Sequence, residues 1–118
     1  MSKINELSLE IIQKQEKIGE LKEEKHSLSN LIDEYESFSN ENKHLFNRLG
    51  ERYIKSELFH SIEQSHNELN FHKRKVISSL QNQQDSLNKE IINIEQDIHN
   101  LEKQKSVEIK FEEESRKS

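Results

Sequence analysis

The sequence contains no cysteine, proline or tryptophan, and it has only two glycines in 118 residues. Without cysteine, the chain forms neither a disulfide framework nor a thiolate zinc site. No stretch approaches the roughly 20 consecutive apolar residues that a membrane-spanning helix needs. With 30% hydrophobic and 35% charged residues, the chain also has too little apolar surface for a compact globule. This composition is typical of long, exposed helices that are stabilised by packing against other helices.

Neither a targeting segment nor a strongly basic face is evident. The first 30 residues lack the basic start, apolar centre and small-residue cleavage site of a secretory signal, so we expect a cytoplasmic protein. The net charge is −5, and the one basic cluster, His72-Lys73-Arg74-Lys75, is too short to outweigh the surrounding acidic residues. We therefore expect no nucleic-acid binding. The polar positions carry Glu as readily as Lys, so we also expect no membrane insertion.

Apolar residues in the first part of the chain recur at alternating steps of three and four, the heptad pattern of a helix that packs against another helix. We call the positions that face the other helix the seam. Lys14 and Lys25 are its polar exceptions, and Ser39 and Asn42 occupy one polar heptad. The apolar members of this seam are Ile4, Leu7, Ile11, Ile18, Leu21, Leu28, Ile32, Tyr35, Phe46, Leu49 and Tyr53.

The last part of the chain repeats the heptad pattern. Its members are Ile77, Leu80, Leu87, Ile91, Ile94, Ile98 and Leu101, with Gln84 and Lys105 interrupting. Upstream, Ile62, Leu69 and Val76 are seven residues apart and follow one frame, whereas Val76, Leu80 and Gln84 are separated by two successive steps of four. This spacing predicts a slip of the frame near Leu80, which alters the supercoil locally without ending the helix.

The chain must reverse for its two seams to face each other, and Gly50 is the favoured place. Glycine tolerates the left-handed conformation that ends many helices. We predict an all-α fold, a long antiparallel helical hairpin that resembles a coiled coil. Residues 1–118 form a single domain with a helix over 3–47, a turn over 48–51, a second helix over 52–111 and a frayed tail over 112–118. A turn at residues 38–42, "FSNEN", remains the alternative.

The stretch around Gly50 holds more apolar residues than a two-helix seam needs, because such a seam uses two positions per heptad. Either the extra residues close a local core over the turn, or they dock against helices of another chain. A lone helix pair has marginal stability, so we favour the second explanation. The expected partner-binding residues are Leu45, Phe46, Leu49, Tyr53, Leu58, Phe59 and Ile62.

No motif predicts chemistry, so we expect neither an enzyme nor a bound cofactor. Phosphate-binding glycine loops, Gly-x-Ser-x-Gly and His-Glu-x-x-His are absent. Four Glu-x-x-His pairs occur, ending at His26, His44, His60 and His66, and di-metal helical bundles use such pairs. The heptad frame turns His26 and His44 outward and leaves only His66 near a seam. We therefore expect no metal site.

Two long helices that reverse at Arg48-Leu49-Gly50 resemble the small helical-hairpin proteins of bacterial type VII secretion, whose turn reads Trp-x-Gly. The Trp is missing here. The whole chain is similar in pattern to the small helical partners of LXG toxins in low-GC Gram-positive bacteria. It has a polar heptad arm, an aromatic middle, "FNRLGERYIKSELFHSI", and a long arm, "LQNQQDSLNKEIINIEQDIHNLEKQ".

The resemblance implies that the chain binds the helical N-terminal domain of a toxin, together with a second small helical protein, and is a targeting chaperone for export. In that family an aromatic-x-x-x-acid motif near a C-terminus marks the export substrate. Here Phe111 is followed four residues later by Ser115, so the resemblance implies that the companion carries the signal. Whether the chain leaves the cell with its cargo is open. The alternative is a structural homodimeric coiled coil, a spacer or a stalk component of another export apparatus, in which Lys14, Lys25 and Gln84 fix the register between chains.

Overall fold

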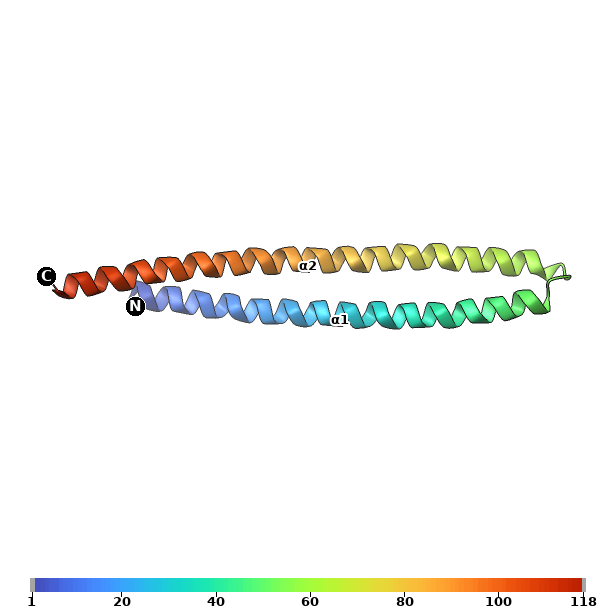
Figure 1. The fold of residues 1–118 in the computed structure, drawn as a ribbon, viewed down its shortest axis with the longest axis horizontal. Coiled ribbons are helices and arrows are strands. Elements are labelled where there is room, and N and C mark those ends of the chain that lie inside the picture. Colours follow the sequence, from blue (N-terminus) through green and yellow to red (C-terminus); the bar gives the residue numbers. More distant parts are fainter. Residues whose placement is uncertain (1, 118) are drawn as a thin grey trace. The chain divides into compact units, whose positions relative to one another are not determined.

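The computed structural model describes residues 2–117. It contains two α-helices, α1 (Lys3–Arg52) and α2 (Leu58–Lys117), joined by a turn over residues 53–57 (Figure 1). No strand occurs within residues 2–117. The predicted all-α helical hairpin is therefore confirmed.

Contacts along the chain define two compact units. Unit 1 combines the residues up to Lys25 with those from Asp85 onwards, and unit 2 comprises His26–Gln84. Unit 1 is an antiparallel pair of helix segments, one from α1 and one from α2. Unit 2 is the hairpin that contains the turn. Each unit brings together stretches that are distant in the sequence.

Unit 1 has the better-formed core. Leu7 and Ile11 of α1 are buried against Leu101 of α2, and Ile98 packs beside them. Leu21 and Ile91 are also buried. Two ion pairs between the helices lie outside this core, Lys3 with Glu108 at 3.7 Å and Lys14 with Asp97 at 3.6 Å. Antiparallel pairing of α1 with α2 follows from these contacts.

Unit 2 is held by smaller and more polar contacts. Ile32 is its one buried apolar side chain among the described residues. The Gln84 side-chain amide donates a hydrogen bond of 2.8 Å to the hydroxyl of Ser29. Near the turn, the rings of Phe46 and His66 stack with their centroids 5.2 Å apart. Unit 2 therefore has fewer buried apolar side chains than unit 1.

The seam predicted for the first helix is confirmed at every position. Each of its apolar members is buried or half-buried, and Lys14, Lys25, Ser39 and Asn42 are half-buried in phase with them. The cause is the strict alternation of steps of three and four, which keeps one narrow face of α1 directed at α2.

The seam of α2 differs from the prediction in one region. Its half-buried or buried members are Phe59, Ile62, His66, Asn70, Lys73, Ile77, Leu80, Gln84, Leu87, Ile91, Ile94, Ile98, Leu101, Lys105 and Glu108. The two successive steps of four are Ile62 to His66 to Asn70, so the frame slips there and not near Leu80. Leu69 and Val76 lie outside the seam and are 41% and 37% exposed. The aliphatic run from Ile77 onwards sets the later frame, and Phe59 and Ile62 set the earlier one, so the mismatch is absorbed between them.

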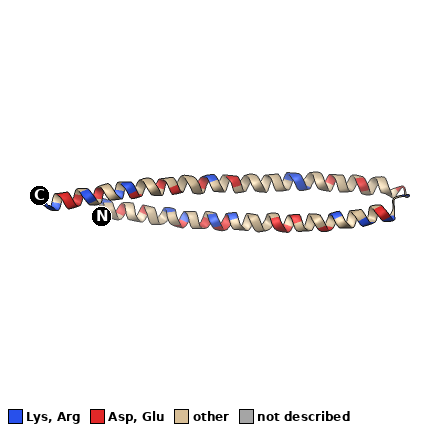
Figure 2. Cartoon of the chain, in the orientation of Figure 1, with Lys and Arg blue, Asp and Glu red and all other residues tan. Residues whose placement is uncertain are grey.

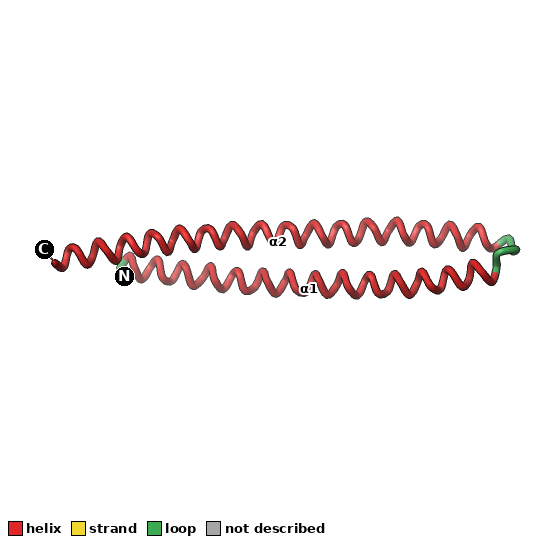
Figure 3. The backbone as a smooth tube through the Cα atoms, viewed as in Figure 1, coloured by secondary structure: helices red, strands yellow, loops and turns green. Residues whose placement is uncertain are grey.

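The prediction of the turn was wrong. Gly50 lies inside α1, the helix includes Arg52, and no residue of the described chain has a positive φ. The Tyr53 amide donates to the Leu49 carbonyl at 3.0 Å, which continues the helical bonding past Gly50. The chain reverses over residues 53–57 (green in Figure 3). The alternative at 38–42 is also wrong, because those residues are helical.

Serines account for both helix starts. The Ser56 hydroxyl accepts a hydrogen bond from the Leu58 amide at 3.1 Å, and the Ser56 carbonyl accepts one from the Phe59 amide. The Ser2 hydroxyl accepts from the Asn5 amide at 3.2 Å. Such side-chain oxygens satisfy amides that have no acceptor within the first turn of a helix.

The predicted fraying after residue 111 is also wrong over residues 112–117, which are helical. Residue 118 lies outside the described residues. Glu, Lys and Arg have high helix propensity, and Arg116 and Lys117 in the last turn interact favourably with the negative end of the helix dipole.

Candidate functional site

The seven predicted partner-binding residues fall into two groups. Leu45 and Leu58 are exposed, at 45% and 55%. Phe46, Leu49, Tyr53, Phe59 and Ile62 are half-buried and lie along the contact between α1 and α2 or in the turn. The structure therefore leaves only two of the seven largely free for another molecule, and it uses the others mainly to hold the hairpin together.

Leu45 and Leu58 belong to a larger set of exposed apolar side chains in unit 2. Each member immediately precedes a seam residue, and each is between 37% and 58% exposed. We call this set the exposed stripe. Its members are Leu31, Phe38 and Leu45 on α1 and Leu58, Leu69 and Val76 on α2.

The antiparallel arrangement places the two halves of the stripe on one side of the hairpin. In an antiparallel helix pair, the flank that precedes the seam on one helix lies beside the same flank of the other. Phe38 and Leu69 line a common hollow of unit 2, together with Tyr35 and Asn42 from the seam. The α1 residues of the stripe are seven apart, so they lie on one face of the helix. The stripe is thus a row of apolar side chains along one flank of unit 2.

The extent of the stripe argues for a binding role. Six half-exposed large side chains present roughly 500 Å² of apolar surface, if each has about 180 Å² in total. Patches of about 300–600 Å² are often functional in soluble proteins. Sequence reasoning found Leu45 and Leu58 and missed the other four. The seven-residue spacing of Leu31, Phe38 and Leu45 was the signal that could have revealed them.

The seam beside the stripe contains an unsatisfied polar atom. Nε2 of His66 is buried and has no hydrogen-bond partner among residues 2–117, although the ring stacks on Phe46. Asn42, Asn70 and Lys73 are half-buried in the same part of the seam. A buried polar atom without a partner costs about 1–3 kcal/mol. This polar segment therefore weakens the hairpin next to the exposed stripe.

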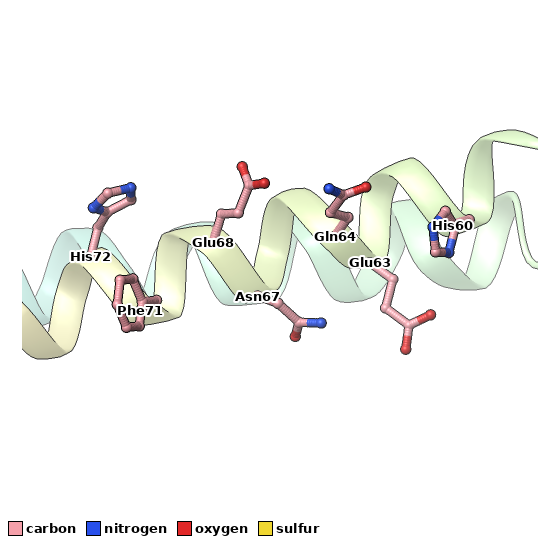
Figure 4. Close-up of a pocket in the computed structure, with 7 residues that line it drawn as sticks. All are labelled: His60, Glu63, Gln64, Asn67, Glu68, Phe71 and His72. Atoms are coloured by element: carbon pink, nitrogen blue, oxygen red, sulfur yellow. The ribbon is translucent and has the colours of Figure 1, made fainter.

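The other Glu-x-x-His histidines, His26, His44 and His60, are exposed. Within residues 2–117 no three His, Cys, Asp or Glu side chains are placed to share a metal ion. One hollow along α2 is lined by His60, Glu63, Gln64, Asn67, Glu68, Phe71 and His72 (Figure 4). Glu68 and His72 point to one side of the helix and Glu63 and Asn67 to the other. These polar groups do not converge on one point.

Charged side chains of both signs are mixed along both helices (Figure 2). The basic cluster after His72 is divided among different faces of α2. Lys73 is half-buried on the seam, whereas Arg74 and Lys75 are exposed. The Lys75 ammonium lies 4.5 Å from the centre of the Phe71 ring. No helix within residues 2–117 has an apolar run long enough to cross a membrane.

Comparison with known proteins identifies no relative of this chain. No family model, no curated protein and no solved structure matches the chain.

Proposed function

We propose that the chain is a non-enzymatic helical binding protein that uses the exposed stripe to hold helices of another protein. In its specific form, the proposal is that it binds the helical N-terminal domain of an LXG-type toxin, with a second small helical protein, as a targeting chaperone for type VII export. The observation that carries the binding role is the row of apolar side chains on one flank of unit 2. The sequence resemblance alone supports the toxin and the export route.

The spacing of the stripe favours a helix as its ligand. Apolar side chains that repeat every seven residues form a straight row along a helix, and the complementary surface is another helix with the same repeat. Burying roughly 500 Å² yields about 12 kcal/mol before costs, and association costs about 4–15 kcal/mol. A stable complex therefore requires a partner surface that is itself apolar, so that burial is favourable on both sides.

The alternative, a parallel homodimer joined through the seams, is less favoured by the contacts within the chain. In that arrangement Lys14 and Gln84 would meet groups of a second chain. Here Lys14 pairs with Asp97, and Gln84 donates to Ser29. Lys14 and Gln84 thus have partners in their own antiparallel pair, which favours a hairpin over a parallel dimer.

Substitutions on the stripe test the binding role. Phe38→Glu and Leu69→Glu place charges on exposed positions, so the helices persist while the apolar row is interrupted. The variants are co-expressed with the helical N-terminal domain of an LXG-type toxin, and affinity is measured by calorimetry. We expect each substitution to cost at least about 2 kcal/mol, or roughly thirtyfold in affinity.

Ile92→Glu is the matched control, because Ile92 is 53% exposed but lies in unit 1, outside the stripe. It should leave the affinity within about twofold. Equal losses for Ile92→Glu and the two stripe variants would contradict a specific surface. The absence of any complex with the LXG-type toxin domain would refute the toxin assignment.

A further inference from the structure

Neither the turn nor crowding within the chain explains why a glycine occupies position 50. It lies inside α1 with an ordinary helical conformation. A Cβ atom at this position would meet only a ring carbon of Phe59, at 3.7 Å, which is a normal van der Waals contact. An alanine therefore fits and would favour the helix by about 1 kcal/mol. Gly50 therefore weakens α1, although packing within the chain does not require a glycine at this position.

Gly50 lines a groove on unit 2. Its apolar lining includes Phe46 of α1 and Phe59 and Ile62 of α2, on either side of Gly50. Its volume is about 360 Å³, at the lower end of the roughly 300–1,000 Å³ typical of ligand pockets. These three residues belong to the predicted partner-binding set, and in the structure they line the same groove.

The charged residues that line this groove are acidic. Glu51 follows Gly50 on α1, and Glu63 follows Ile62 on α2. Within the described part of the chain, no lysine or arginine lines the groove. An apolar floor with carboxylates on both helices is complementary to an apolar side chain whose neighbours on its own helix are basic. Two carboxylates that line one groove are also unfavourable to an acidic ligand.

We propose that the groove over Gly50 receives an apolar side chain from a helix of the binding partner, and that lysine or arginine residues beside this side chain pair with Glu51 and Glu63. This deepens the proposed function and rests on it for the identity of the natural ligand. The absence of a Cβ atom at Gly50 lets the partner helix approach α1 closely, as glycine does at other close contacts between backbones.

The two glycines provide a direct experiment on the full-length chain. Backbone amide signals of Gly50 and Gly19 are followed by NMR during titration with synthetic helices of about 20 residues, long enough to be helical in water. One peptide carries a central leucine flanked by lysines one turn before and after it, and its counterpart carries glutamates there. Gly19 has nothing near its Cβ position and serves as the internal control.

We expect the lysine peptide to shift the Gly50 signal and leave the Gly19 signal in place. The glutamate peptide should need roughly fivefold more peptide for the same shift, since exposed ion pairs contribute little each. Glu51→Gln with Glu63→Gln should abolish this difference, whereas Glu57→Gln, on an exposed turn residue, should preserve it.

Three outcomes overturn the inference. In the first, neither peptide shifts the Gly50 signal at millimolar concentration. In the second, both shift it equally. In the third, the peptides shift only the amides of the exposed stripe. The toxin is absent from this experiment, so its failure would leave the proposed function intact. Conversely, the absence of a toxin complex would not show whether the groove binds an apolar side chain.

Discussion

At the scale of single residues, substitution of the two glycines shows whether each position matters for the stability of α1. Gly50→Ala and Gly19→Ala should each raise the free energy of unfolding by about 0.5–1 kcal/mol, because alanine loses less conformational entropy in a helix and neither position is crowded. Urea unfolding followed by circular dichroism measures the effect. A loss of stability in Gly50→Ala, with a gain in Gly19→Ala, would show that the space over Gly50 is needed by the fold itself.

His66 is the second residue whose environment predicts a stability effect. Its buried Nε2 has no hydrogen-bond partner, so His66→Leu should stabilise unit 2 by about 1 kcal/mol, despite the loss of the stack on Phe46. Urea unfolding provides the measurement. His99→Leu, at an exposed position of unit 1, is the control and should change stability by less than about 0.5 kcal/mol. Destabilisation by His66→Leu would indicate a bonding partner for the imidazole.

At the scale of elements, the sequence identified the seam of α1 because the first half of the helix sets its frame, and few apolar residues compete with the seam there. Its apolar residues keep one strict heptad frame, and the residues on either side are mostly polar in the first half of the helix. In α2 the frame was ambiguous. Leu69 and Val76 are as apolar as the true seam residues, and His66 and Asn70 are polar. Periodicity alone cannot decide which of two rows faces the neighbouring helix.

The turn was misplaced for a related reason. Gly50 is a strong local signal for the end of a helix, yet in the structure the helical hydrogen bonding continues past it to Tyr53. The weaker signal was Ser56, which caps α2. The error also affected the candidate site. The sequence grouped Leu45 with the residues around a turn at Gly50, whereas in the structure it belongs to a row that continues along α1 to Leu31.

At the scale of the whole molecule, burial is unequally distributed. Five of the six buried apolar side chains in the described chain belong to unit 1, and unit 2 contains only Ile32. Unit 2 instead carries the exposed stripe, the polar segment of the seam and the groove over Gly50. The unit with fewer buried apolar side chains thus carries the exposed stripe and the groove over Gly50, so we expect binding and folding of this unit to be coupled.

This coupling predicts how the isolated chain behaves. Without its partner, the purified protein should self-associate through the exposed stripe in a concentration-dependent way, and its thermal midpoint should rise with protein concentration. Sedimentation velocity at several concentrations measures the first effect. Combining Phe38→Glu with Leu69→Glu should shift the distribution towards monomer, whereas Ile92→Glu should not. A single dimer, unchanged by dilution and by the stripe variants, would favour the homodimeric spacer. A stable monomer with a high thermal midpoint would contradict a binding role for the stripe, because the hairpin would then be stable with its apolar row in water.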